Sequence, residues 1–261
     1  MDILDQYVVR LPSAQNVVDL FDGEWSSKMP EGSGLVSTPG TAALFSDGRI
    51  SWAESVFGGF ADKNILELGP LEAAHSYMMQ SAGAKSITAI EANSRAFLKC
   101  LCIKELFNLN RVSFKFGDFV SFLEQNKNKF DIAIASGVLY HMADPVRVLD
   151  LIASAADKIF IWTHYFDKDL IGRNESSAAR FGEIETATYQ GFEYRFASQA
   201  YKQEALDWSG FCGGPEKSSK WLTKDSIVGF LNKAGFTDIR EQFHQPDHQN
   251  GPAFAICAQR Q

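Results

Sequence analysis

The stretch that decides the fold runs from Asn64 to His75 and reads NILELGPLEAAH. Its first five residues are a short apolar run that predicts a buried strand, and residues 73–82 have the spacing of a helix. Between the two, Gly69-Pro70 predicts a tight turn. A glycine at the carboxyl end of the first strand of an open α/β sheet is typical of a nucleotide site, because the backbone turns sharply and a ligand approaches closely.

The same alternation of strand and helix continues along the chain. Further strands are predicted at 86–90, 112–116, 130–135 and 158–163, with helices at 94–107, 119–125 and 145–155. After residue 220 the sequence predicts a helix at 223–234 and strands at 237–243 and 252–258, which are close enough to pair antiparallel. We therefore expect an α/β fold with a doubly wound, mostly parallel, seven-stranded Rossmann-like sheet and an antiparallel last strand.

Two segments depart from this pattern. Residues 1–60 mix aromatic residues with Gly, Ser and Pro, and predict a preface of loops and short helices, one of them at 51–57. Residues 165–220 carry ten aromatic residues, too many for a disordered segment, and a loop of that length is usually functional. We expect residues 61–261 to form one ligand-binding domain, with 165–220 as an ordered insertion that covers the substrate.

The bulk composition narrows the partners. The 261-residue chain has a formal net charge of −7, whereas proteins that bind a phosphate backbone mainly by charge are more often basic. The acidic N-terminus lacks the apolar core of a secretory signal, and no window approaches the ~20 apolar residues of a membrane span. Cys100, Cys102, Cys212 and Cys257 match no metal motif or disulfide framework. We expect a cytoplasmic protein that has free thiols and binds neither metal nor membrane. Its expected partner is a small-molecule substrate, and nucleic acid is a less expected one. The sequence does not indicate an oligomeric state.

The residues around Gly69 separate two cofactor classes. A dinucleotide places its pyrophosphate on the helix N-terminus, where glycines make room. Here Leu71 and Ala74 replace those glycines, and Glu72 is expected to repel phosphate. S-adenosylmethionine carries no phosphate and has a sulfonium cation, which the carboxylate of Glu67 suits. We therefore expect S-adenosylmethionine rather than NAD; an NAD-linked oxidoreductase and a non-catalytic binding protein of the same fold remain the alternatives.

The ends of the other strands complete the expected cofactor site. Glu91 ends the second strand 22 residues after Gly69, the spacing at which a carboxylate reaches ribose hydroxyls. Asp118 and Phe119 follow the third strand and offer a carboxylate and an aromatic edge to adenine. The predicted cofactor-binding residues are Glu67, Gly69, Pro70, Glu91, Ala92, Asp118, Phe119 and Ser136.

Candidate catalytic residues follow the fourth and fifth strands. Tyr140 and His141 come four and five residues after Ser136, at the crevice where transferred groups lie, and His141 is the first candidate for general base, with Tyr140 beside it. The candidate substrate residues are Trp162, His164 and Tyr165. His75, on the first helix, is expected to pack or cap instead.

Four motifs in this order and spacing resemble those of class I S-adenosylmethionine-dependent methyltransferases, from about residue 60 to the end. They are ELG at 67–69, the strand end at Glu91, GDF at 117–119 and FDIAIASGVLYHMADPVRVL at 130–149. The resemblance implies that Glu67 and Gly69 surround the methionyl end of the cofactor, Glu91 the ribose, and Asp118 with Phe119 the adenine. It implies methyl transfer to an acceptor, which we expect to be a small organic molecule.

Within that class, two segments most resemble the tRNA wobble-uridine carboxymethyltransferases, which use carboxy-S-adenosylmethionine. These segments are GVLYHMADP at 137–145 and WLTKDSIVGFLNKAGFTDIR at 221–240. That group uses a lysine ahead of the first motif to hold the extra carboxylate, whereas this chain has no lysine between Lys28 and Lys63. Carboxymethyl or methyl transfer to tRNA is therefore the alternative function.

Overall fold

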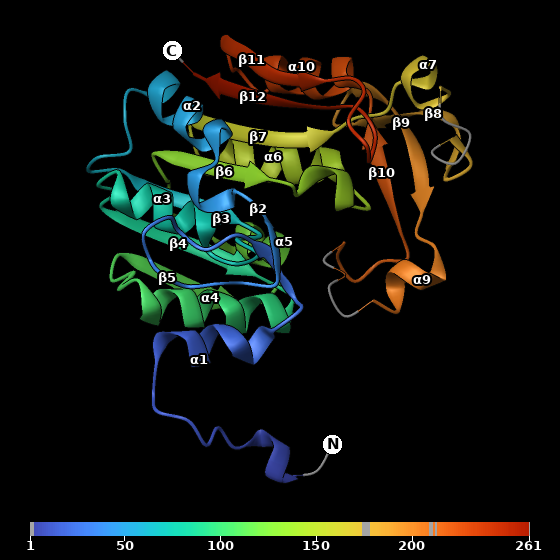
Figure 1. Ribbon diagram of the computed structural model, residues 1–261. Helices are drawn as coiled ribbons and strands as arrows, with labels where there is room; N and C mark the ends of the chain where they lie inside the picture. Colours follow the sequence, from blue (N-terminus) through green and yellow to red (C-terminus); the bar gives the residue numbers. More distant parts are fainter. Residues whose placement is uncertain (1–2, 174–177, 209–210, 212, 261) are drawn as a thin grey trace.

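Seven strands form one mixed sheet through the centre of the computed structural model, which describes residues 3–173, 178–208, 211 and 213–260 (Figure 1). In spatial order they are β11 (Asp238–Gln245), β12 (Ala253–Gln259), β7 (Lys158–His164), β6 (Ile132–Ser136), β3 (Asn64–Leu68), β4 (Ser86–Glu91) and β5 (Val112–Phe116). The strands from β7 to β5 pair in parallel, and β12 is antiparallel to both β7 and β11. The predicted sheet, including its antiparallel last strand, is confirmed.

Helices cover both faces of this sheet, so its central strands are buried on both sides and read as continuous apolar runs. In β3, Ile65 joins a core with α2 (Gly48–Phe57), α3 (Ala74–Ser81) and α4 (Ser94–Leu106). Its neighbours Leu66 and Leu68 join the opposite core, with α5 (Phe119–Gln125), α6 (Pro145–Ala155) and α10 (Lys224–Lys233). The side-chain alternation of a strand thus divides one apolar run between two cores.

Capping side chains fix where these helices begin. Asn93 and Asp118 accept hydrogen bonds from the first backbone N–H groups of α4 and α5, and Thr223 does the same for α10. Asp144 caps α6, whose first residue is Pro145. Asn93 and Asp118 follow the ends of β4 and β5, at the edge of the sheet where a ligand site is expected.

The segment 165–220 contains a second, antiparallel sheet of order β10-β9-β8, which the sequence does not predict. Its strands are β8 (Phe181–Tyr189), β9 (Phe192–Ala200) and β10 (Ser218–Leu222), and α7 (Lys168–Ile171) and α9 (Gln203–Leu206) flank them. Gln190 and Gly191 connect β8 to β9 with φ of 46° and 76°, which fits the tight turn of a two-residue hairpin. On the inner side of β9, Tyr194 and Phe196 are buried in the α6 and α10 core.

The N-terminal segment also contains strands where only loops and short helices are predicted. Its elements are η1 (Ile3–Gln6), α1 (Ala14–Val18), η2 (Asp19–Phe21), β1 (Trp25–Ser27), β2 (Pro39–Ala42) and η3 (Leu44–Ser46). The strands β1 and β2 pair in parallel, and the fully buried Trp25 donates its Nε1–H to the Val18 carbonyl at 2.8 Å. Within the part of the chain that the structure describes, no helix is long and apolar enough to cross a bilayer.

Candidate active site

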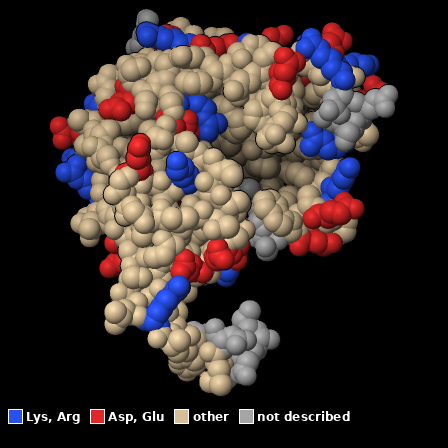
Figure 2. Space-filling model, in the orientation of Figure 1, with Lys and Arg blue, Asp and Glu red and all other residues tan. Residues whose placement is uncertain are grey.

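A cavity of about 500 Å³ opens at the carboxyl ends of the parallel strands. Figure 2 shows this face of the molecule hollowed between the main body and the segment that carries β8 to β10. Ten of the predicted site residues line the cavity: Gly69, Pro70, Glu91, Ala92, Asp118, Phe119, Ser136, Tyr140, His141 and Trp162. These residues come from the ends of β3, β4, β5, β6 and β7, so the topology brings together side chains that lie far apart in sequence.

Three predicted residues do not line this cavity. Glu67 is buried and accepts a hydrogen bond from the Ser76 hydroxyl, and burial raises the pKa of its carboxyl. His164 lies behind the wall, with its ring 4.6 Å from that of Tyr140. The Tyr165 hydroxyl is hydrogen-bonded to His244 Nε2 at 2.7 Å, beside a separate hollow. Any contact of these three with a ligand is therefore indirect.

The loop after β3 has left-handed backbone at three positions, of which only the first is a glycine. Gly69, Leu71 and Ala73 have φ of 63°, 54° and 60°, which is the left-handed region. This conformation costs an L-residue with a side chain about 1–2 kcal/mol. The Leu71 N–H donates to Glu91 Oε2 at 3.1 Å, so the end of β4 holds the loop in this conformation. Leu71 therefore adopts a left-handed conformation without a glycine at its position.

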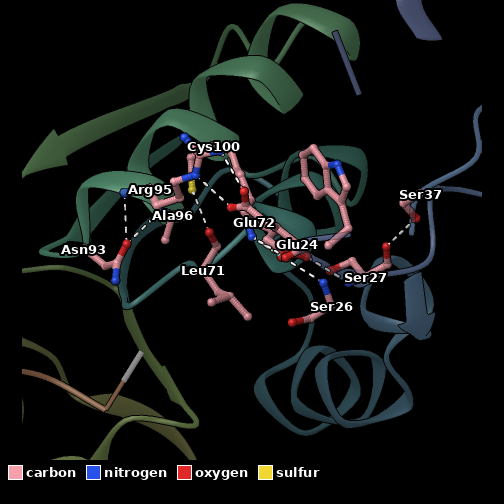
Figure 3. Close-up of polar contacts among 12 residues, drawn as sticks. Glu24, Ser26, Ser27, Ser37, Leu71, Glu72, Asn93, Arg95, Ala96 and Cys100 are labelled. Atoms are coloured by element: carbon pink, nitrogen blue, oxygen red, sulfur yellow. Dashed lines mark hydrogen bonds and ion pairs between the residues drawn. The ribbon is translucent and has the colours of Figure 1, made fainter. Parts of the chain in front are cut away.

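Glu72 corrects the electrostatic part of the sequence argument. Glu72 is 1% exposed and does not line the cavity. Figure 3 shows its carboxylate directed toward Ser26 and Ser27. It accepts hydrogen bonds from the backbone N–H groups of Ser26 and Ser27 at 3.0 and 2.8 Å, and forms an ion pair with Lys99 at 2.9 Å. The prediction that Glu72 would repel phosphate is therefore wrong, because its charge is neutralised outside the site.

The buried ion pair between Glu72 and Lys99 stabilises the contact of β1 with the cofactor loop, so removing one partner should destabilise the fold. We expect Lys99→Met to lower the free energy of unfolding by about 3 kcal/mol or more, because it leaves the Glu72 carboxylate buried without its counter-ion. Chemical denaturation measures this change. The control is Arg95→Met, which breaks the more exposed pair with Glu24 and is expected to cost about 1 kcal/mol or less. Equal losses in the two variants would contradict this account.

Two carboxylates mark the opposite ends of the expected nucleotide site. Glu91 accepts hydrogen bonds from Asn93 N–H at 2.9 Å and from Leu71 N–H, and burial raises its pKa. Asp118 caps α5 through the N–H groups of Val120 and Ser121. Burial favours the neutral form of Asp118, but these bonds and the Ser121 hydroxyl outweigh it and lower its pKa. Both carboxylates are thus held in fixed orientations at the cavity wall.

A cluster that the sequence does not reveal lies on the same wall. Asp47 caps α2 and binds Arg49 Nη2 at 2.6 Å and His75 Nε2 at 2.9 Å. Although burial opposes it, these hydrogen bonds hold the pKa of Asp47 far below its usual range. Arg49 and His75 both line the cavity, and the Arg49 guanidinium lies 4.4 Å from the centre of the Trp162 ring. His75 pairs with Asp47 and also lines the cavity, so its expected packing role stays a prediction. Arg49 brings a cation to the cavity from the N-terminal segment, where no sequence motif indicates one.

His141 and the segment 165–220 close the other side of the cavity. His141 Nδ1 is 2.9 Å from the Tyr201 hydroxyl, and burial, with neighbouring His164, lowers the His141 pKa to about 4. Phe211, Gly214 and Pro215 add to the lining. The Asn93 side-chain amide donates to the Phe211 carbonyl at 3.1 Å, which ties this segment to the start of α4.

Because His164 is buried, we expect the free energy of unfolding to depend on pH. His164 donates its Nδ1–H to the Gly251 carbonyl at 2.8 Å, and burial, with His248 and Arg180 nearby, lowers its pKa to about 4. The unfolded chain takes up the proton first, at the ordinary pKa of about 6.5. His164 therefore stabilises the fold above pH 6.5, and this contribution is lost as the pH falls toward 4.

We expect the wild type to lose about 1–2 kcal/mol more unfolding free energy between pH 7 and pH 5 than His164→Gln. Denaturant titrations at both pH values measure the two losses. The comparison between variants cancels the opposite contributions of Glu67 and Glu91, whose raised pKa values favour the fold at lower pH. Parallel pH profiles would show that His164 is not the group responsible.

Cysteines and metal-binding side chains add no further chemistry to the described residues. Cys100, Cys102 and Cys257 are free thiols, and Cys212 lies outside the described residues. Across residues 3–173, 178–208, 211 and 213–260, His, Cys, Asp and Glu form no group of three or more that could hold a metal ion.

Comparison with known proteins agrees with this fold and cavity. The family described as "Methyltransferase domain" matches residues 60–206, which is more than half of the chain. The N-terminal domain of EvdMO1, crystallised in the presence of SAH and D-fucose, aligns with a TM-score of 0.69 and 19% identity over 94% of each chain. A 1,6-didemethyltoxoflavin-N1-methyltransferase from Burkholderia thailandensis, with S-adenosylhomocysteine bound, aligns with a TM-score of 0.53 and 13% identity over 84% of this chain and 79% of its own.

The curated relatives align over a smaller part of the chain. A tRNA U34 carboxymethyltransferase from Campylobacter concisus is 27% identical over 195 residues, which are 71% of this chain and 66% of the relative. Its counterpart from Campylobacter hominis is 27% identical over 110 residues, 41% of this chain and 38% of the relative. The chain thus spans less than two thirds of the length of these relatives. The family match nevertheless decides the class: the chain belongs to the methyltransferase domain family, and its fold is that of the class I enzymes.

Proposed function

We propose that this chain transfers a methyl group from S-adenosylmethionine to a small organic acceptor. The observation that carries the proposal is the cavity at the carboxyl ends of β3 to β7, where the buried Glu91 carboxylate and the left-handed loop at Gly69 face one space. Ligands bind at this edge in open α/β sheets. Because Glu72 is turned into an ion pair with Lys99, the choice of S-adenosylmethionine over a dinucleotide is supported by the methyltransferase family match and by fold neighbours with S-adenosylhomocysteine bound.

The cofactor-binding roles follow from where each side chain lies. Glu91 would accept hydrogen bonds from the ribose hydroxyls, because its two oxygens are already oriented by backbone N–H groups. Asp118 and Phe119 would contact adenine. Gly69 and Pro70 would pass close to the methionyl end, and Ala92 and Ser136 leave room at the adenosine and methyl positions. We propose that Glu67 acts indirectly, by holding Ser76 and thereby the start of α3.

The chemical step is a displacement that the chain accelerates by alignment. When bound, S-adenosylmethionine would supply an electrophilic methyl group, with its sulfur as the leaving group when the acceptor bonds to that carbon. The residues that line the cavity would align the two molecules and exclude water, which would contribute most of the rate. We propose that His141 takes the proton of the acceptor, with Tyr140 packed against its ring at 4.1 Å. Trp162 would line the acceptor's side, with His164 and Tyr165 behind it.

A small acceptor is favoured by the lining and by the fold neighbours. Phe211, Gly214 and Pro215 of the segment 165–220 narrow the cavity, which supports its role as a substrate cover over the domain 61–261, with 1–60 as a preface. EvdMO1 was crystallised with D-fucose and the Burkholderia enzyme with 1,6-didemethyltoxoflavin, both small molecules. The net charge of −7 also favours a small acceptor over nucleic acid. We propose a cytoplasmic location on the sequence evidence alone.

Calorimetric titration of S-adenosylhomocysteine tests the cofactor site directly. We expect micromolar binding to the wild type, which corresponds to about −8 kcal/mol, and at least a tenfold loss in Glu91→Ala. Glu105→Ala, which removes an exposed carboxylate from α4, is the matched control and should bind like the wild type. Thermal melts of all three proteins separate loss of binding from loss of folding. Absence of binding to a folded wild type would sink the methyltransferase proposal.

Carboxymethyl transfer is the second candidate, and one observation favours it. Arg49 precedes the first motif and lines the cavity, so a guanidinium is available where the carboxymethyltransferases use a lysine. Asp47 already forms two hydrogen bonds with the Arg49 Nε and one with its Nη2, which neutralises that charge.

We therefore expect the wild type to bind S-adenosylmethionine at least as tightly as carboxy-S-adenosylmethionine. Competition calorimetry with the two cofactors measures the preference, in the wild type and in Arg49→Met. A tenfold or greater preference for the carboxylated cofactor that disappears in Arg49→Met would replace methyl transfer with carboxymethyl transfer.

A further inference from the structure

The hydrogen bond between His141 and Tyr201 joins two distant parts of the chain. His141 ends η4 (Leu139–His141), directly after β6, whereas Tyr201 follows β9 in the segment 165–220. The Tyr201 N–H donates to the Lys217 carbonyl at 3.1 Å, which fixes Tyr201 beside the start of β10. Its hydroxyl oxygen then lies 2.9 Å from His141 Nδ1. The orientation of the candidate base is thus set from outside the sheet that carries it.

The direction of this hydrogen bond decides which imidazole nitrogen is basic. A phenol has one proton, and the Tyr201 hydroxyl donates it to the Gly213 carbonyl at 3.5 Å. In the arrangement that satisfies both contacts, the hydroxyl oxygen accepts from His141, and the imidazole proton is on Nδ1. Nε2 keeps its lone pair and is the nitrogen left for an acceptor molecule in the cavity. With the opposite tautomer, Nε2 would carry a proton and could not act as a base.

We propose that Tyr201 is a positioning residue that holds His141 in its Nδ1–H tautomer, so that the general base is complete only when the cover is in place. This inference rests on the role proposed above for His141. The lowered His141 pKa supports it, because an imidazole that stays neutral must be in one tautomer or the other. A phenol orients the ring without adding a negative charge, so it fixes the tautomer while leaving the imidazole neutral.

The tautomer can be measured without knowing the acceptor. Two-dimensional ¹H–¹⁵N spectra of histidine side chains distinguish protonated from lone-pair nitrogens, and His141→Gln identifies the His141 signals among the five histidines. We expect the Nδ1–H tautomer at pH 7 in the wild type and a shift toward Nε2–H in Tyr201→Phe, which removes only the hydroxyl. Tyr165→Phe is the control: it removes a hydroxyl that is hydrogen-bonded to His244, and should leave the His141 signals unchanged. A wild-type Nε2–H tautomer, or the same His141 tautomer in Tyr201→Phe, would overturn the proposal.

Kinetics provide the second measurement once an acceptor is found. We expect Tyr201→Phe to lower kcat by about tenfold or more, because part of the population carries the wrong tautomer, with KM and S-adenosylhomocysteine affinity changed less than twofold. A loss of affinity with unchanged kcat would show a structural role instead. The two proposals fail differently: a wild type that does not bind S-adenosylhomocysteine removes the proposed function, whereas an unchanged tautomer in an active Tyr201→Phe removes only this inference.

Discussion

The conformation of the loop after β3 is the constraint on which the site depends. Leu71 and Ala73 occupy a backbone region that side chains disfavour, so surrounding contacts must hold them there. Glu91 binds the Leu71 N–H from the cavity side, and Glu72 binds β1 and Lys99 from the opposite side. The Glu91 carboxylate faces the cavity, and the Glu72 carboxylate anchors the N-terminal segment. Contacts with β4, α4 and β1 therefore hold the cofactor loop in this conformation, which its own residues would not favour.

The fold was predictable because its signals are local and repeated. The central strands β3, β4, β6 and β7 are short apolar runs, the helices α4, α5 and α6 begin at capping residues, and the spacing between strands and helices favours a parallel sheet. The strands β8 to β10 were missed because their pattern is not local: on β8 most side chains are exposed, and β9 buries Tyr194 and Phe196 against helices from elsewhere in the chain. The Gln190-Gly191 turn was the available signal, but a single dipeptide does not define a sheet.

The site was predictable at the strand ends and unpredictable elsewhere. Glu91, Asp118 and His141 reach the cavity because the topology fixes the position of a strand end. Arg49 lines the cavity and Tyr201 contacts His141 through long-range packing of segments that carry no motif, so no spacing rule could place them. The assumption about Glu72 failed for a related reason: on a short loop, the direction of a side chain depends on the partners available, and these came from β1 and α4.

The hydrogen bond between Asn93 and Phe211 also bears on how the protein is made. It joins residues 118 positions apart, and the same Asn93 side chain caps α4. Contacts of such separation form late, because ordering the intervening chain costs entropy before the contact is gained. During synthesis the parallel strands β3 to β7 emerge before residue 215, which belongs to the wall of the cavity, and β11 and β12 emerge after it. The nascent chain therefore has its parallel strands before it can enclose the site, and it completes the antiparallel edge of the sheet last.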